Sequence, residues 1–381
     1  MTFRAYTGSA VRLIARSYLM TVGFVLFALV VIALSIDLTK TLDELRAKAE
    51  AANTPLWHIL MPYASYRAVD VLTRLLGTAC VIGGFLAVLW RHQRREDVVL
   101  ATAGLSPSYH FTAILMVALV FGALQFSFQN WVRPVAVKAQ VETQLGRYGQ
   151  WFGSTEVGEH WIVGNDTAIT ASVNRGEGAR LENVKIFEGL SAPTLTRVIR
   201  ADRALPDPDA TLWVLENVTL WTAESGFAPK RLDDLRLALP INAASLQWYG
   251  VHGFYLPNSA AREIATLTGT EAASDAQTTL AFRQLAFFLP GVLIFLGASL
   301  AQSGLSGRRL HPPRLMALAA VGYLTVVGVK SFWILGINGR VPPHLAAALP
   351  LAIAFGVACL LQLHHAGYLF RRKVGLQGRN A

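Results

Sequence analysis

Six long apolar stretches constrain this chain more than any other feature of its sequence. Each holds about 20 consecutive, mostly apolar residues, enough for a helix to cross the hydrocarbon core of a bilayer. A buried core helix is the alternative for any single stretch, but six of them separated by charged loops favour a membrane protein. Trp131 and Trp333, near span ends, are expected to anchor the chain at the membrane interface. The expected spans lie near residues 17–36, 71–90, 107–128, 280–301, 315–336 and 342–363.

A polar segment at residues 129–278 separates the first three apolar stretches from the last three. Its short runs of β-branched and aromatic residues, divided by Gly and Pro clusters, are typical of strands. Several short antiparallel strands suit a sandwich or a jelly roll. We therefore predict an all-β domain inserted between two membrane halves. The expected strands are Trp161–Val163, Ala168–Val173, Val184–Glu188, Thr196–Ala201, Thr211–Trp221 and Arg236–Leu239.

A short motif recurs within this polar segment. The tetrapeptide Leu-Glu-Asn-Val occurs at residues 181–184 and again at 215–218, each time followed by alternating apolar and polar residues. This alternation predicts two similar, half-buried strands. Four residues are too few to define an internal repeat.

The distribution of charge predicts which side of the membrane each loop faces. Segments 1–16, 91–106, 302–314 and 364–381 together contain thirteen Arg or Lys and two acidic residues, whereas residues 129–278 contain thirteen basic and seventeen acidic residues. Basic residues beside span ends mark the cytoplasmic side. Both termini are therefore expected in the cytoplasm and the β domain outside it. The net charge of +10 reflects this topology and does not indicate a nucleic-acid patch.

Motifs for catalysis and metal binding are not found in the sequence. There is no Gly-x-x-x-x-Gly-Lys-Ser/Thr phosphate loop, no Gly-x-Ser-x-Gly and no His pair at metal-ligand spacing on a helix. The two cysteines, Cys80 and Cys359, both fall within apolar stretches, so no disulfide is expected in the β domain. We therefore expect no catalytic residue, no metal site and no cofactor bound by this chain.

The chain is predicted to divide into three consecutive regions. Residues 1–130 hold three spans and a short cytoplasmic helix near 94–104, residues 131–258 form the β domain, and residues 259–381 form a connecting helix and three further spans. Asn53–Pro55 is expected to form a turn between the first two helices.

Ionisable residues in or beside the outer halves of the spans are the candidate functional groups. A charge at the bilayer centre costs roughly 2.5–3.5 kcal/mol on insertion scales, so such groups tend to be paired, hydrated or functional. One interpretation is internal pairing, as between Asp70 and Arg74 one helical turn apart. The other is a cationic ring that recognises an anionic headgroup. Both stay open for Arg74 and Lys330, whereas pairing is favoured for Arg67 and Arg283. The set comprises Asp37, Lys40, Arg67, Asp70, Arg74, Arg283 and Lys330.

A short helix is predicted in the basic turn after the second span. It begins near Glu96 and Asp97, presents an apolar face and ends at Gly104. A solvated surface turn is the ordinary interpretation. An exposed apolar face beside charge is also what docking of a cytosolic partner requires, since burying each aliphatic side chain contributes roughly 1.5–3 kcal/mol.

Five stretches of the chain carry a resemblance to a known family. Arg95–Ser106 looks like a coupling helix with its acidic residue and closing glycine, Arg180–Phe187 and Leu212–Val218 are similar to jellyroll strands, and Phe282–Pro290 looks like an Arg-to-Pro entry to span four. Over nearly its whole length the chain resembles the LptF/LptG permeases, the membrane subunits of the lipopolysaccharide-exporting ABC transporter. Val341–Pro350 is similar to the LptG branch in particular.

This resemblance implies a fold, a function and a set of partners. The fold is membrane α-helical, with six transmembrane helices in a 3+3 arrangement and an inserted periplasmic all-β jellyroll domain, in the bacterial inner membrane. The function is that of a non-enzymatic permease subunit that extracts lipopolysaccharide and passes it to the periplasmic bridge. The partners are an LptF-type permease, an LptC-type bitopic protein and a cytosolic LptB-type ATPase dimer that uses ATP and Mg²⁺. A permease subunit of another ABC-type lipid or lipoprotein exporter is the alternative.

The resemblance also implies roles for individual residues. Asp37 stands at the outer end of span one, where LptG-type proteins can carry a basic residue facing the lipid phosphates, and Arg74 stands where small or apolar residues are more usual. Arg74 or Lys40 is expected to compensate. The expected lipid-phosphate contacts are Lys40, Arg67, Arg74 and Lys330. The expected ATPase contacts are Arg94, Arg95, Glu96, Asp97, Val98, Val99, Leu100 and Gly104.

Overall fold

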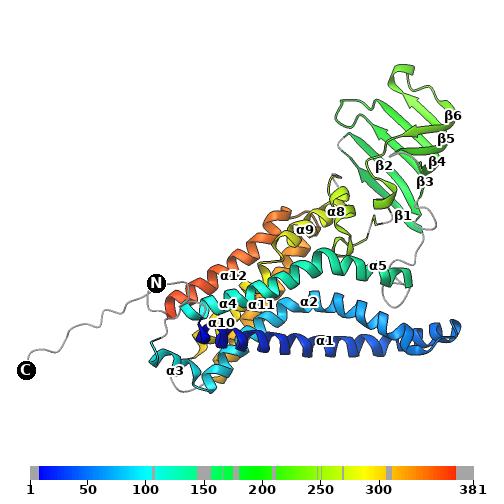
Figure 1. The fold of residues 1–381 in the computed structure, drawn as a ribbon. Coiled ribbons are helices and arrows are strands. Elements are labelled where there is room, and N and C mark those ends of the chain that lie inside the picture. Colours follow the sequence, from blue (N-terminus) through cyan, green and yellow to red (C-terminus); the bar gives the residue numbers. More distant parts are fainter. Residues whose placement is uncertain are drawn as a thin grey trace, which may run out of the picture.

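In the computed structural model, a long bundle of helices has a β-sheet at one of its ends (Figure 1). The N-terminal and C-terminal helices both belong to the bundle, and the sheet comes from the middle of the chain. The structure describes residues 8–365 except 105–107, 144–155, 165, 175–179, 208–211, 247, 250, 268–269 and 306–310.

Helices are found at all six predicted spans. Five helices are each long and apolar enough to cross a membrane, within the part of the chain that the structure describes. The fourth predicted span is instead two helices, α9 (Glu271–Leu285) and α10 (Leu289–Gly304), bent by 65° at a short break. Pro290 is the second residue of α10 and lies in its first turn, where a missing N–H is tolerated. The unbroken spans belong to α1 (Ser9–Ala51), α2 (Leu56–Gln93), α4 (Ser108–Ser127), α11 (Pro312–Ile337) and α12 (Pro343–His365).

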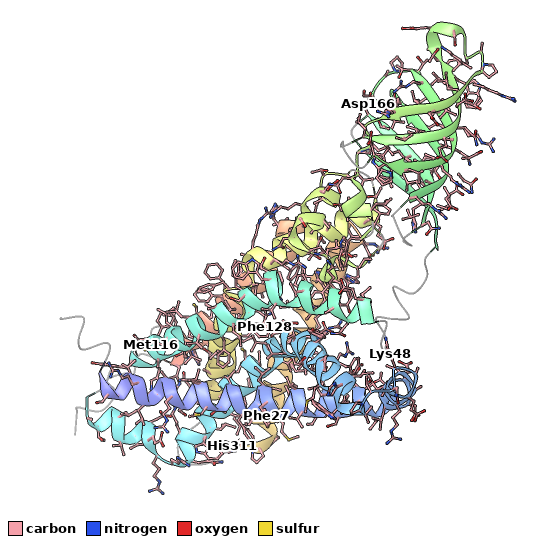
Figure 2. The ribbon with its side chains drawn as sticks, turned by 45° about the vertical axis from the view of Figure 1, so that its right-hand side comes forward. Phe27, Lys48, Met116, Phe128, Asp166 and His311 are labelled. Carbon is pink, nitrogen blue, oxygen red and sulfur yellow. The ribbon has the colours of Figure 1, made fainter. Side chains whose placement is uncertain are left out.

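The first two helices form a hairpin that is longer than a membrane requires. α1 has 43 residues and α2 has 38, and they pack against each other. The chain reverses between Ala51 and Leu56, with Asn53 in the left-handed region at φ 49°, which confirms the predicted turn. Lys48 lies near the tip of this hairpin, whereas apolar side chains such as Phe27 cover the outer surface of α1 (Figure 2).

The third span continues as a helix well past residue 130. A π-helical turn, η2 (Phe128–Val132), joins α4 to α5 (Arg133–Thr143). Such wide turns shift the face on which the following residues lie and are frequent at functional sites. α5 packs against α2, so Arg133 at its start is brought to the middle of the bundle.

The close contact between α2 and α10 depends on a glycine from each helix. A Cβ atom on Gly84 of α2 would lie 2.6 Å from the carbonyl oxygen of Ile294 on α10. A Cβ on Gly297 of α10 would collide with the carbonyl oxygen of Val81 on α2. Small residues allow transmembrane helices to approach this closely, and dispersion contacts then hold them together. As a result α10 is buried over most of its length.

The insert is a six-stranded antiparallel sheet among the described residues, in the chain order β1 to β6. The inserted β domain is therefore confirmed. Its connectivity is a meander, whereas a jelly roll has Greek-key connections. All six expected strands exist, but most are longer than expected. The strands are β1 (Glu156–Val163), β2 (Thr167–Asn174), β3 (Arg180–Glu188), β4 (Arg197–Pro206), β5 (Trp213–Thr222) and β6 (Lys230–Leu237).

The largest error concerns the last strand, which was expected at Arg236–Leu239 and lies at Lys230–Leu237. Its first five residues include two bases and two acids, so no apolar alternation marks them. The strand forms because its backbone pairs with β5, from Trp213 opposite Leu237 to Leu220 opposite Lys230. Charged residues are common on such edge strands, where they oppose pairing with other chains.

The repeated Leu-Glu-Asn-Val motif corresponds to a repeated backbone kink. Its asparagines, Asn183 in β3 and Asn217 in β5, both have left-handed φ values of 54° and 53°. Asparagine tolerates this conformation better than other residues that carry a Cβ. Between them, β4 carries Asp202, whose carboxylate accepts a hydrogen bond of 3.1 Å from the Asn217 amide. The motif therefore marks a kink in β3 and another in β5, and Asp202 of the strand between them bonds to the second.

One face of the sheet is buried against the segment that returns to the bundle. Ile169, Leu181 and Leu215 share an apolar core with Trp248 and Leu256, which follow the last strand. This returning segment contains α7 (Ala243–Leu246), the short helix η4 (Gly253–Tyr255) and α8 (Asn258–Ile264). Residues 252–257, here called the connector, thus link the sheet core to the helix bundle.

Candidate functional site

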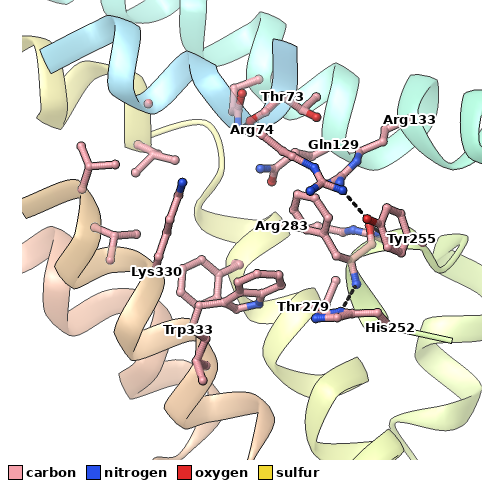
Figure 3. Close-up of a pocket in the computed structure, with 18 of the residues that line it drawn as sticks. Thr73, Arg74, Gln129, Arg133, His252, Tyr255, Thr279, Arg283, Lys330 and Trp333 are labelled. Carbon is pink, nitrogen blue, oxygen red and sulfur yellow. Dashed lines mark hydrogen bonds between the residues drawn. The ribbon is translucent and has the colours of Figure 1, made fainter. Parts of the chain in front are cut away.

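A cavity of about 400 Å³ lies where the connector meets the bundle. Its walls are formed by α2, by the third span with its π-helical turn, by the connector, and by α9, α10 and α11. Arg74 enters it from α2 and Lys330 from α11 (Figure 3). Two of the four predicted lipid-phosphate contacts therefore meet in one cavity.

The lining of this cavity is amphipathic. Leu289, Leu293 and Val326 provide aliphatic surface, whereas the guanidinium of Arg74 and the ammonium of Lys330 provide positive charge. None of the described residues that line it is acidic. Such an arrangement can hold a molecule that has both an anionic group and an alkyl chain.

Asp70 organises the basic residues on one side of the cavity. It is fully buried, and its Oδ1 atom accepts hydrogen bonds from Arg133 Nη2 at 2.6 Å and from Arg74 Nε at 3.1 Å. Its Oδ2 atom accepts from Arg67 Nη1 at 3.1 Å. A buried carboxylate needs such partners because desolvation of the charge is costly. One acid from α2 thereby holds three arginines from α2 and α5.

A second acidic residue extends this cluster to α1. The carboxylate of Asp37 accepts two hydrogen bonds from Arg67, of 2.7 and 2.9 Å, and one of 2.8 Å from the Tyr63 hydroxyl. Arg67 is therefore paired on both sides and does not line the cavity, which supports the pairing interpretation. Lys40 is exposed on α1 and is not part of the cavity lining either.

The connector is held in the cavity wall by α9. The backbone N–H of Gly253 donates to Asp275 Oδ2 at 2.7 Å, and the Arg283 guanidinium donates to the carbonyl oxygen of Leu256 at 2.7 Å and to Asn258 Oδ1 at 2.8 Å. A Cβ on Gly253 would lie 2.6 Å from Asp275 Oδ1. Only glycine fits at this close approach. Arg283 thus has the structural, paired role that the sequence favoured.

Aromatic residues close the wall between the connector and α11. The Trp333 ring lies 5.1 Å from the ring of Phe254 and 5.2 Å from that of His252, measured between centroids. The Trp333 ring thus packs into the cavity wall, and its expected role as a membrane-interface anchor stays a prediction. Trp131, by contrast, is 59% exposed.

The predicted short helix lies at the end of the bundle opposite the sheet (Figure 1). α3 spans Glu96–Thr102, and Gly104 beyond it has a left-handed φ of 78°, as expected for a glycine that ends a helix. Val98 and Val99 are 59% and 65% exposed, so an apolar surface faces outward. Glu96 lies beside them, 3.9 Å from the Arg94 guanidinium.

A buried arginine connects α3 to three membrane helices. Arg91 of α2 is 1% exposed, and its Nη2 atom lies 3.6 Å from the carboxylate of Asp97 in α3. The same nitrogen lies 3.2 Å from His110 Nδ1 on α4 and 3.4 Å from the Tyr18 hydroxyl on α1. Displacement of α3 would therefore disturb the contacts that Arg91 of α2 makes with α1 and α4.

Sequence reasoning missed two parts of the site. Arg133 was assigned to the β domain, although a basic residue within five positions of the end of an apolar run was a usable signal. The connector residues His252, Phe254 and Tyr255 carry no local signal, since only chain reversal after the sheet places them in the cavity. Both were found only from the contacts between distant segments.

Comparison with known protein families identifies a match over most of the chain. A family model described as "Lipopolysaccharide export system permease LptF/LptG" matches residues 12–364. Among curated proteins no match was found. Within the described residues, no group of three or more His, Cys, Asp or Glu is arranged to hold a metal ion.

Proposed function

Because this chain belongs to the LptF/LptG family of lipopolysaccharide export permeases, we propose that it is the LptG-type member of a permease pair that encloses a path for lipopolysaccharide. Members of this family are permease subunits and do not catalyse a reaction themselves. The chain is a multi-pass inner-membrane protein. An LptB-type ATPase dimer would supply the energy from ATP and Mg²⁺.

The amphipathic cavity is the observation that carries this proposal. Lipopolysaccharide has an anionic, phosphorylated headgroup and several acyl chains. Arg74 and Lys330 are positioned to contact phosphate from different walls, and arginine pairs with phosphate in a planar, bidentate geometry. The aliphatic surface of Leu289 and Val326 suits an acyl chain. A soluble anion would not use that apolar wall.

The two ends of the bundle suggest the sidedness of the molecule. α3 and the sheet lie at opposite ends (Figure 1), and the loop that contains α3 is rich in basic residues. We place α3 and both termini in the cytoplasm and the sheet in the periplasm, in accordance with the distribution of basic residues. The exposed face of Val98 and Val99 would then meet the ATPase.

Transport would couple these two ends. Closure of the ATPase dimer would displace α3, and the buried Arg91 would transmit this displacement to α1, α2 and α4. Narrowing of the cavity would move the lipid towards the sheet. An LptC-type protein would receive the lipid next.

The cavity is tested by charge reversal of Lys330 in the purified complex. Lys330→Glu is expected to reduce photo-crosslinking to lipopolysaccharide strongly, because it places a carboxylate opposite the lipid phosphate. Lys138→Glu is the matched control, since Lys138 is an exposed cation on α5 outside the cavity. Equal crosslinking in both variants, with the complex intact, would contradict the proposed binding site.

The docking role of α3 is tested by Glu96→Lys. This variant is expected to lose co-purification with the ATPase, because the reversed charge lies beside the exposed apolar face. Glu142→Lys changes an exposed carboxylate on α5, at a distance from α3, and should leave co-purification intact. If the Glu96→Lys variant still co-purifies with the ATPase, α3 is not the docking element.

A further inference from the structure

Tyr255 ties the connector to α2 through the same arginine that faces the cavity. Its hydroxyl is hydrogen-bonded to Arg74 Nη2, and its ring lies 5.6 Å from the Arg74 guanidinium carbon (Figure 3). The Tyr255 side chain is buried, whereas the Arg74 side chain is 40% exposed. Arg74 therefore has Asp70 on one side, Tyr255 on another and the cavity on a third.

The donors of Arg74 are already shared in this structure. Nε donates to Asp70 Oδ1 at 3.1 Å, and Nη2 lies 3.1 Å from Asp70 Oδ2 as well as against the Tyr255 hydroxyl. A phosphate that pairs with Arg74 through two parallel hydrogen bonds needs donors on one edge of the planar guanidinium. Nη2 is one of the donors that such a phosphate would use, and in this structure it already donates to the Tyr255 hydroxyl.

From this arrangement we propose that the phosphate of a lipid headgroup displaces Tyr255 from Arg74, so that filling the cavity releases the connector from α2. This inference rests on the proposed function and adds to it a link between lipid binding in the cavity and the position of the connector. Lipid bound in the cavity would change the connector, and through it the sheet core, before the lipid itself reaches the sheet.

The exchange favours phosphate for electrostatic reasons. A phosphate brings a full negative charge to the Arg74 guanidinium, whereas the Tyr255 hydroxyl offers only a dipole, so the phosphate adds a charge–charge attraction that the tyrosine lacks. Asp70 does not depend on Arg74 alone, because Arg67 and Arg133 also donate to it. Arg74 can therefore turn towards the cavity without leaving a buried carboxylate unpaired. Lys330 on the opposite wall adds a second positive charge.

The connector is built to pass such a change to the sheet. Leu256 follows Tyr255 directly and is buried in the sheet core with Trp248 and Ala261. Tyr255 itself packs against Val137 of α5. Movement of the tyrosine would thus disturb one contact in the bundle and one in the sheet. The anchors at Gly253 and Leu256 limit that movement to a small displacement of η4.

A double-mutant cycle on the purified complex tests the competition. Tyr255→Phe keeps the ring and removes only the hydroxyl, so the affinity for bisphosphorylated lipid A is expected to rise by about threefold to tenfold, as for the loss of one competing hydrogen bond. In an Arg74→Ala background the same change should have no effect. Tyr249→Phe is the matched control, because its hydroxyl bonds to the Trp161 carbonyl oxygen, away from the cavity.

Hydrogen exchange tests the release of the connector. Lipid A should accelerate amide exchange in residues 252–256 of the unmodified complex, whereas the same lipid without phosphates should not. Inorganic phosphate at the same concentration should also have no effect, and an equal acceleration by it would contradict a lipid-borne ligand.

The outcomes separate this inference from the proposed function. Binding of lipid A with unchanged exchange in the connector, or a Tyr255→Phe effect that persists without Arg74, would overturn the inference alone. No binding of lipid A to any form of the complex would overturn the proposed function and, with it, the inference.

Discussion

The helix bundle and the sheet both contain short ion pairs, but these pairs differ in their surroundings. In the bundle, Arg133 and Asp70 are 2.6 Å apart and each side chain is 1% exposed. In the sheet, Arg197 and Glu188 are 2.7 Å apart and 31% and 21% exposed. The two ion pairs therefore have nearly the same N–O distance and differ in the burial of their side chains. Breaking a buried pair leaves an uncompensated charge, whereas an exposed charge is solvated by water.

This contrast extends to what each region needs its charges for. The sheet is held by backbone pairing along all six strands and by one apolar face, so its ion pairs are secondary. In the bundle, Asp70 and its arginines determine the shape and charge of a cavity wall. Charged residues thus organise the candidate site in the bundle, whereas in the sheet they lie on the surface and contribute little to the fold.

The strongest test of this comparison is Asp70→Asn. We expect a loss of about 3–5 kcal/mol in the free energy of unfolding, because Arg133 would stay buried without a carboxylate. Thermal unfolding of the purified protein measures it. Asp43→Asn makes the same chemical change at an exposed position of α1 and should be neutral. Similar unfolding temperatures for both variants would show that the buried Asp70 carboxylate does not stabilise the protein.

The second test concerns the backbone kink at Asn217 in β5. Asn217→Ala is expected to cost about 1–2 kcal/mol, because alanine is strained in the left-handed conformation. Asn217→Gly should cost less, since glycine adopts that conformation freely. Hydrogen exchange of β4 and β5 in the full chain measures both. Equal losses would assign the effect to the hydrogen bond with Asp202 and not to the backbone.

A smaller effect is expected when the exposed pair of the sheet is broken. Glu188→Gln should change the free energy of unfolding by about 0.2–1 kcal/mol, the range measured for exposed pairs. Raised salt should reduce the difference from the unmodified protein, because exposed charges are screened. A cost comparable to that of Asp70→Asn would remove the distinction between the two regions.

The smallest effect is a pH dependence at the edge of the sheet. Hydrogen bonds from the Ser191 hydroxyl and backbone N–H lower the pKa of Asp166. Because the pKa is lower in the folded chain, its stabilising contribution is present above the unfolded-state pKa and is lost as pH falls through the folded-state pKa. The Ser191 amide should exchange faster at such acidic pH. Asp166→Asn should remove this dependence; its persistence would assign it to another group.

Local patterns predicted most elements of the fold. Apolar runs located the spans, the turn at Asn53–Pro55 was found from turn-forming residues, and α3 was found from its acidic start and closing Gly104. These elements follow from hydrogen bonds and solvation within a few residues. Strand β6 was misplaced because its pairing with β5, and not its own composition, makes it a strand.

The candidate site was predicted only in part. Arg74 and Lys330 were identified because charges within apolar runs are conspicuous. Their surroundings were not: Arg133 reaches Asp70 through a π-helical turn, and Tyr255 reaches Arg74 across 181 positions of sequence. The roles of the ATPase contacts and of the three predicted regions stay predictions.

The sequence by itself determined which segments enter the membrane, where the β domain is inserted and which family the chain resembles, because hydrophobic length and local charge are properties of neighbouring residues. Only the tertiary structure decided which arginines are paired and which face the cavity. That choice depends on burial beside Asp70 and on the returning connector, and both arise when distant segments pack together.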